Sequence, residues 1–294
     1  MKKVLQMAWM NVLLSYRVKI AFFFTFVFPM MFFFIYFSLF AKGNPATVAD
    51  LMGPLISFSV ISNALFGLSV QLVTMRERDM LRRYHLAPIH PAEMVGSRLL
   101  SNYLLFMPLV VLQYALAVWW YKMPVHGSLW ALWLVFSLGY LSLGAIGLVV
   151  AGIVDTVQEA TVWNQILFFG LLFLTGTTLP LMSLPHFIQR LSLFMPPTLM
   201  ILGSAGIMLG GQGVAQNWQV IIGLLLITCS SLGLGTALFR WEKEEKTTRR
   251  QRLQAALALI PVLIVGIWLN TSASFQKSDQ AYIQASSAAF NNMK

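Results

Sequence analysis

The chain is poor in charge: Asp, Glu, Lys and Arg together make up 10% of its 294 residues, while 58% are hydrophobic. A soluble domain carries roughly 25% charged residues, because its surface has to be solvated. So little charge excludes a soluble enzyme of this size, and so much apolar sequence excludes a disordered protein. The composition therefore predicts an integral membrane protein.

Cysteine pairs and catalytic motifs are absent as well. Cys229 is the single cysteine, which excludes a disulfide framework and a thiol metal cluster. The sequence contains no phosphate-binding G-x-x-x-x-G-K-[ST] loop, no H-E-x-x-H zinc motif and no G-x-S-x-G nucleophile motif. Its four histidines occur at irregular spacings, which does not favour a metal site. We therefore expect no catalytic residues, no metal and no bound cofactor in this chain.

Long apolar runs dominate what is present, and they predict an all-α fold with six core membrane spans. Each run is about long enough for one helix across a hydrocarbon core of roughly 30 Å. We place the spans at about 20–40, 53–74, 99–120, 129–152, 161–181 and 218–239. Pro29 interrupts the first span and is expected to kink it.

Three further segments are expected outside these spans. Residues 1–18 carry apolar side chains at helical spacing and predict an amphipathic helix in the membrane interface, with an extension of the first span as the alternative. Four prolines and a glycine cluster within 176–217 predict short re-entrant helices between the fifth and sixth spans. Residues 253–269 are a marginally long apolar stretch, and we expect a seventh helix there.

The net charge of +10 is distributed unevenly, which predicts orientation rather than nucleic-acid binding. Fifteen of the twenty Lys and Arg residues fall on the side of the membrane that holds the N-terminus. Since basic residues are retained on the cytoplasmic side, the N-terminus is expected to be cytoplasmic. The spans carry no ionisable residue at mid-depth, so transport driven by a proton relay within this chain is not expected. Asp155 and Glu159 are interpreted as a solvated loop pair.

The sharpest local signal lies between the second and third spans. Residues 75–87 are dense in charge and are interpreted as one short helix that ends before Pro88, with Leu81 as its anchor on the membrane side. Pro91 is expected to start the next helix, with Glu93 in its first turn. The alternative is an ordinary positively charged cytoplasmic loop.

This segment resembles the cytoplasmic coupling segment of ABC-2 type exporter permeases. The pattern Glu77-Arg78-x-x-Leu81-x-Arg83, then Ala87-Pro88 and Gly96-x-Arg98-Leu99, is similar to the family pattern E-R-E-x-G-T-L-x-R-L-x-x-[TS]-P followed by G-K-L. Asp79-Met80 replaces the family's Gly-Thr pair. The resemblance covers about 1–242 and includes the interfacial helix and the proline-rich stretch before the sixth span.

The resemblance implies a permease subunit of an ATP-binding-cassette exporter. It implies a homodimer or heterodimer in a bacterial inner (plasma) membrane, with ATP and Mg bound by a separate ABC ATPase subunit. Residues 19–242 would be the transmembrane domain, and 243–294 a C-terminal extension: a seventh helix with an external tail, a re-entrant anchor or the remnant of a fused protein. Residues expected to couple to the ATPase are Glu77, Arg78, Leu81, Arg82 and Arg83. An ion-coupled secondary transporter and a non-transporting scaffold or sensor are the alternatives.

Two polar faces are candidates for the substrate pathway. The second span carries Ser59, Ser62, Asn63 and Phe66 on one helical face, and the fifth carries Asn164, Phe168, Thr175 and Thr178. A polar face without a partner is unfavourable in lipid, so both should turn inward. The alternative is that they are helix-packing faces. The pair Asn63 and Phe66 resembles the Asn-x-x-Phe of related multidrug exporters, which favours an efflux pathway for an amphipathic or lipid-like cargo.

Overall fold

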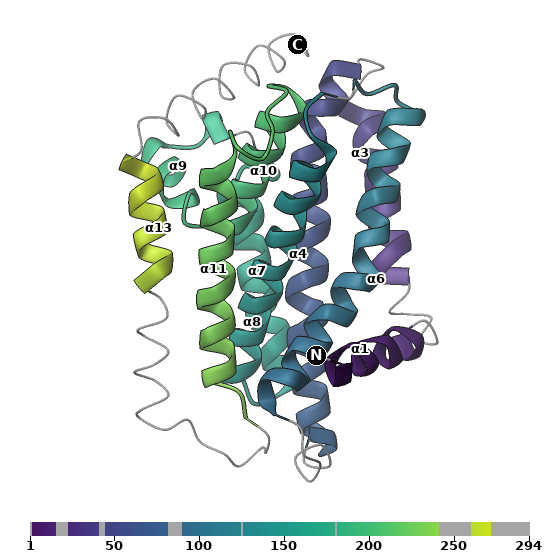
Figure 1. Ribbon diagram of the computed structural model, residues 1–294, viewed down its shortest axis with the longest axis vertical. Coiled ribbons are helices and arrows are strands. Elements are labelled where there is room, and N and C mark those ends of the chain that lie inside the picture. Colours follow the sequence, from purple (N-terminus) through teal and green to yellow (C-terminus); the bar gives the residue numbers. More distant parts are fainter. Residues whose placement is uncertain are drawn as a thin grey trace.

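The computed structural model describes residues 2–15, 23–40, 45–81, 90–124, 126–179, 181–240 and 260–271, and within these ranges it is entirely helical. Five helices are long and apolar enough to cross a membrane. They stand side by side in one bundle (Figure 1), and they are α4 (Pro45–Glu77), α6 (Pro91–Trp119), α7 (Leu129–Ile153), α8 (Val157–Leu174) and α11 (Trp218–Ala237). The second to sixth expected spans are therefore confirmed.

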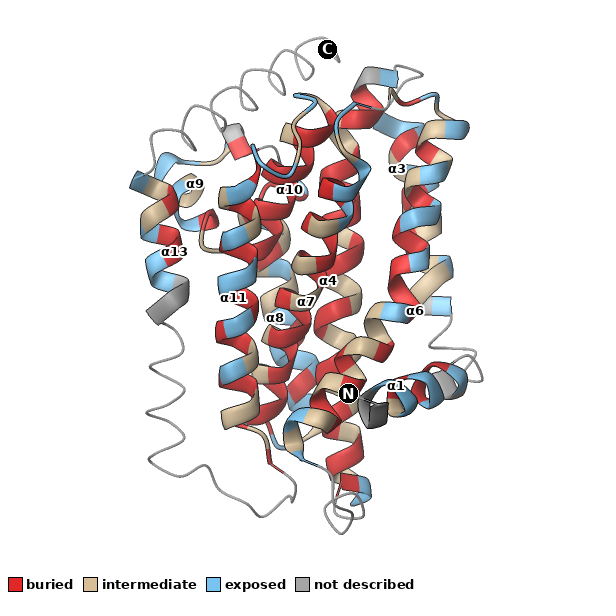
Figure 2. Ribbon diagram, viewed as in Figure 1, coloured by how far each residue is buried: buried red, intermediate tan, exposed pale blue. Residues whose placement is uncertain are grey.

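Helix α7 is the centre of the bundle and packs against α4, α10 and α11. Burial is concentrated along it and along the inner faces of its neighbours (Figure 2). Gly147 makes the contact with α4 close, because a Cβ there would lie 2.9 Å from the Leu65 carbonyl oxygen. Small residues at such crossings are how membrane helices gain packing energy in the absence of a hydrophobic driving force between them.

The first expected span takes an irregular form. A π-helical turn, η1 (Phe23–Val27), leads directly into α3 (Phe28–Phe40), and the apolar helix from Thr25 to Phe40 is shorter than the five full spans. Pro29 lies in the first turn of α3, where the amide that it lacks would have no helical partner in any case. The disturbance expected from Pro29 is therefore a π-helical turn just before it rather than a kink inside α3.

The proline-rich stretch forms the predicted broken helices. After the 3-10 turn η2 (Leu181–Ser183), α9 (His186–Ser192) and α10 (Pro196–Met208) meet at an angle of 91°. Pro196 occupies the first position of α10 and sets the bend. Helix α10 is almost wholly buried against α4, α7 and α11, which allows irregular backbone to exist within a bundle of membrane spans.

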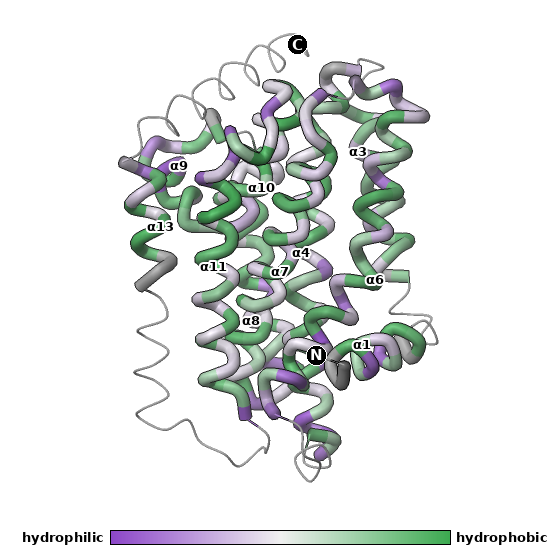
Figure 3. Tube along the Cα trace, viewed as in Figure 1, coloured by the Kyte–Doolittle hydropathy of each residue, from purple (hydrophilic) through white to green (hydrophobic). Residues whose placement is uncertain are grey.

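The N-terminal helix α1 (Lys2–Ser15) lies across the foot of the bundle, beside α6 (Figure 1). Ala8 and Val12 are buried, whereas Leu5, Trp9 and Leu13 form an exposed apolar stripe four residues apart. Hydropathy follows the same arrangement over the molecule, with apolar helix middles and hydrophilic residues gathered near the ends (Figure 3). An amphipathic helix with one apolar face on protein and another available to lipid fits the expected interfacial position.

The last described helix, α13 (Ile260–Thr271), lies within the C-terminal extension and packs on α11. Val265 and Leu269 are buried, and the ring of Trp268 lies 5.4 Å from that of Trp218. Its 12 residues span about 18 Å at 1.5 Å per residue, less than a hydrocarbon core. Residues 241–259 and 272–294 lie outside the described residues, so the three interpretations of the extension stay predictions.

Candidate functional site

The expected coupling segment begins as the end of a span rather than as a separate helix. Helix α4 continues without a break through Glu77, and a turn follows at Arg78 and Asp79. Asp79 has φ of 53°, a left-handed conformation that favours glycine and that Asp tolerates better than most residues. The prediction of one helix over 75–87 is therefore wrong at Asp79, the position where the family pattern has glycine.

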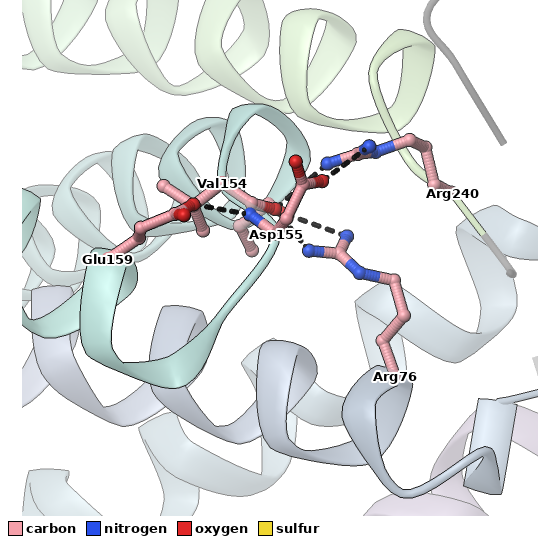
Figure 4. A network of polar contacts seen from close by, with 6 residues as sticks. Arg76, Val154, Asp155, Glu159 and Arg240 are labelled. Carbon is pink, nitrogen blue, oxygen red and sulfur yellow. Dashed lines mark hydrogen bonds and ion pairs between the residues drawn. The ribbon is translucent and has the colours of Figure 1, made fainter. Parts of the chain in front are cut away.

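Two buried arginines at this end of the bundle converge on the connection between α7 and α8 (Figure 4). Arg76 donates from Nη1 to the Ala151 carbonyl oxygen at 2.9 Å and from Nη2 to that of Val154. Arg240, just after α11, donates to the same Val154 oxygen at 2.8 Å. These carbonyls end α7, where helical partners run out and the helix dipole is negative, so cations are favourable there. Arg76 and Arg240 thus tie α4 and α11 to one point.

Acidic residues complete this connection. Asp155 forms an ion pair with Arg240 at 2.8 Å, and Glu159 accepts a hydrogen bond from the Asp155 amide at 2.9 Å. Glu77 accepts from the Val157 amide at 2.8 Å and so caps the start of α8 from the end of α4. The interpretation of Asp155 and Glu159 as a merely solvated pair is wrong, because both hold the α7–α8 connection in place.

Sequence reasoning did not single out Arg76 and Arg240. Both lie at the ends of apolar runs, where basic residues are common for reasons of orientation alone. The only signal that could have found Arg76 is its position one residue before the charged segment, still within the last turn of an apolar helix. Which carbonyls it meets depends on how α4 and α7 pack.

The remaining expected coupling residues differ in exposure. Arg78 is exposed, whereas Leu81 is buried beside Met75 and Met94, as an anchor should be. Arg82 and Arg83 lie outside the described residues. The next helix begins as predicted: His90 caps α6 and Glu93 accepts from the His90 amide at 3.1 Å. Glu77 is engaged within the chain, and Arg78 stands at the surface.

The two expected pathway faces meet over part of their length. Asn164 of α8 is fully buried and donates to the Ser69 hydroxyl of α4 at 2.5 Å. One turn further along α8, the Phe168 ring makes edge contacts with Phe66 at 6.1 Å and Phe58 at 5.8 Å between centroids. Phe58, Phe66 and Phe168 are all half-buried, so these three rings form an aromatic cluster between α4 and α8 that remains partly open.

Other expected pathway residues are not brought to this cluster. Ser59 accepts from Gln113 of α6 at 3.4 Å, and Asn63 accepts from Tyr140 of α7 at 2.9 Å. Ser62 donates to its own helix at the Ser59 carbonyl, 3.0 Å away. Gln113 and Tyr140, both missed by sequence reasoning, lie alone among apolar neighbours in their spans, and only packing shows what they satisfy.

The end of α8 is the point where its expected face stops. Thr175 is buried and its hydroxyl contacts that of Thr177 at 2.9 Å, while its carbonyl accepts from Thr198 of α10 at 3.3 Å. Thr178 is exposed and separate. Along the described part of the chain, no group of three or more His, Cys, Asp or Glu residues could hold a metal ion.

Comparison with known families finds one match. The model of a family described as "ABC-2 family transporter protein" matches residues 39–240, more than half of the chain. No curated protein and no solved structure matches this chain. The matched region begins in α3 and ends at Arg240, so it contains the charged connection and the aromatic cluster, and it leaves out α1 and α13.

Proposed function

The chain belongs to the ABC-2 family of transporter membrane proteins, and from this premise we propose that it exports an amphipathic or lipid-like cargo. As an ABC-2 permease it is a multi-pass membrane protein that is not itself catalytic, and it implies an ATPase partner. The finer proposal is a dimer of permease chains in a bacterial inner membrane, with a cytoplasmic N-terminus and alternating access driven by ATP hydrolysis in that partner. The family match favours this function over an ion-coupled transporter or a scaffold.

The observation that carries the proposal is the connection at the end of α4. The ATPase would dock on the exposed turn at Arg78 and on Arg82 and Arg83 beyond it. The residues just before this turn, Arg76 and Glu77, are hydrogen-bonded to α7 and to α8. A displacement of the turn would therefore pull on the neighbouring spans at once, because charge-assisted hydrogen bonds are short and strong.

The cargo pathway is proposed to run past the aromatic cluster of Phe58, Phe66 and Phe168. Only a small part of α8 is buried in the single chain: 22% of its most apolar window, against 72% for α7. Val162, Trp163 and Phe169 of α8 are exposed large apolar residues. A second permease chain facing α8 would cover them and would enclose the half-buried rings. Aromatic rings with few fixed polar groups suit cargos that are largely apolar.

The test is reconstitution with the cognate ATPase in vesicles, with cargo-stimulated ATP hydrolysis as the measurement. Phe66→Ala should abolish the stimulation while basal hydrolysis and thermal stability change little, because the ring is only half-buried. Phe173→Ala is the matched control, since Phe173 lies on α8 with 47% of its surface exposed. A Phe66→Ala protein that loses yield and melting temperature together, with stimulation intact in the folded fraction, would show that the cluster only packs the helices. Failure of any ATPase to stimulate the wild-type chain would refute the exporter itself.

A further inference from the structure

An apolar crevice lies between α4, α6 and α7, on a different face of α4 from the contact with α8. Its volume is about 190 Å³, and its walls are almost wholly apolar, among them Ile56 of α4, Val111 and Tyr114 of α6, and Trp133 of α7. It is open at the surface, because Val111 is 59% and Trp133 is 40% exposed. Apolar cavities of this size hold no ordered water and bind hydrocarbon instead.

The crevice continues into a strip of polar side chains along the same three helices. On α4, Asn63 lies two turns from Ile56, and Gly67 and Gln71 follow at intervals of four. On α6, Tyr103 lies one turn from Met107 of the crevice wall, and on α7, Ser137 lies one turn from Trp133. Residues spaced by three, four or seven share a helix face, so crevice and strip form one groove.

The polar side chains of this strip are held toward one another. Tyr140 donates to Asn63 at 2.9 Å, and the hydroxyls of Tyr103 and Ser137 are 2.8 Å apart. Asn102 donates to the Gln71 side chain at 3.5 Å. Asn63, Gln71, Asn102 and Tyr103 remain half-exposed. Each carboxamide can make up to four hydrogen bonds, so unused capacity faces outward in a bundle surrounded by hydrocarbon.

Charge is added at the polar end of the groove. Arg98 lies one helical turn before Asn102, on the same face of α6, and is half-buried. From Asn102 to Tyr114 the groove follows α6 for 12 residues, about 18 Å at 1.5 Å per residue. That length is comparable to one leaflet of a hydrocarbon core roughly 30 Å thick. One groove thus presents a cation, then neutral hydrogen-bonding groups, then a dry apolar crevice.

We propose that this groove binds one anionic phospholipid, with an acyl chain in the crevice and the headgroup at Asn102, Gln71 and Arg98. An empty crevice would forfeit dispersion contacts that a chain from the membrane restores. The carboxamides and the guanidinium complement a phosphate and its hydroxyl-bearing substituent, and a plain hydrocarbon chain would leave them unused. The inference rests on the proposed function only where this lipid is called a cargo; binding itself requires neither ATP nor a partner.

The experiment is a lipid titration of the purified, delipidated full chain followed by native mass spectrometry. The probes are palmitoyl-oleoyl phosphatidylglycerol and the diacylglycerol with the same chains. Val111→Trp places an indole in the crevice from its open side, and Leu112→Trp is the matched control, because Leu112 is 47% exposed and does not line the crevice. Asn102→Leu removes a carboxamide at nearly constant volume.

Wild-type protein should bind one phosphatidylglycerol per chain. Val111→Trp should weaken both lipids by about tenfold, which corresponds to roughly 1.4 kcal/mol, whereas Leu112→Trp should bind as wild type. Asn102→Leu should weaken phosphatidylglycerol and leave diacylglycerol unchanged. Equal binding by the two tryptophan variants would overturn the crevice, and equal losses of both lipids in Asn102→Leu would overturn the headgroup site. If Val111→Trp changed the fraction of dimer and not lipid binding, the crevice would hold a second chain instead.

A second measurement needs no variant. Phosphatidylglycerol with a diazirine in the middle of one acyl chain should label wild-type peptides containing 107–114 and 129–136 after illumination in vesicles. Label spread evenly over all lipid-facing helices would refute a specific groove. Lipid binding without ATP-driven transport would leave this inference standing and refute the exporter, while transport without specific lipid binding would do the reverse.

Discussion

Replacing Arg76 by methionine tests whether the charged connection holds the bundle together. The substitution removes the donors to the carbonyl oxygens of Ala151 and Val154. Arg240 still serves the Val154 oxygen, so the Ala151 oxygen is the acceptor left without its arginine. Methionine retains the apolar stem of the arginine and creates little empty space.

The size of the effect follows from these contacts. A hydrogen bond to a charged group contributes about 1.5–3 kcal/mol, and an orphaned buried acceptor costs about 1–3 kcal/mol. Removing a buried charge regains part of its desolvation cost, which lowers the net loss. We expect Arg76→Met to reduce the free energy of unfolding by about 2 kcal/mol. For domains of 150–250 residues this corresponds to a melting temperature lower by roughly 4–8 °C.

The assay is thermal unfolding of the detergent-solubilised protein at a fixed scan rate, with Arg78→Met as the control. Arg78 is exposed and two residues away, and substitutions at such positions usually change stability by less than about 0.5 kcal/mol. Equal melting temperatures for the two variants would refute the reasoning. The double variant with Arg240→Met should lose more than the sum of the single losses, because the Val154 oxygen then has neither arginine.

Three further predictions concern other parts of the chain. Asp79→Gly should raise the melting temperature slightly, by up to about 1 kcal/mol of relieved left-handed strain, and a lower value would contradict that origin. Gly147→Ala should destabilise by about 1–3 kcal/mol in denaturant unfolding, because its Cβ would meet backbone of α4, whereas Gly170→Ala on α8 meets nothing within 4 Å and should stabilise by about 0.5–1 kcal/mol. With the native cysteine replaced, an impermeant maleimide added outside intact cells should label His126→Cys and not Gln158→Cys; both positions are exposed, and the reverse pattern would overturn the orientation.

Much of the architecture was determined by the sequence itself. Apolar runs of membrane length place α4, α6, α7, α8 and α11 without knowledge of packing, because hydrocarbon admits only segments whose backbone hydrogen bonds are satisfied internally. The prolines from Pro185 to Pro197 likewise predict where the helix between α8 and α11 must break, since proline lacks an amide donor. The residue pattern around Leu81 was sufficient to indicate the family.

The tertiary structure decided what the polar side chains do. Asn63 and Asn164 read as equal members of two polar faces, yet Asn63 turns to Tyr140 on α7 and Asn164 to Ser69 on α4. Arg76 and Arg240 read only as basic residues at span ends, and they converge on one carbonyl. A polar group in a membrane protein must find a partner, but the sequence carries only the need for one. Which partner lies within hydrogen-bonding distance is set by helix rotation and crossing, and those depend on contacts between residues far apart in the chain.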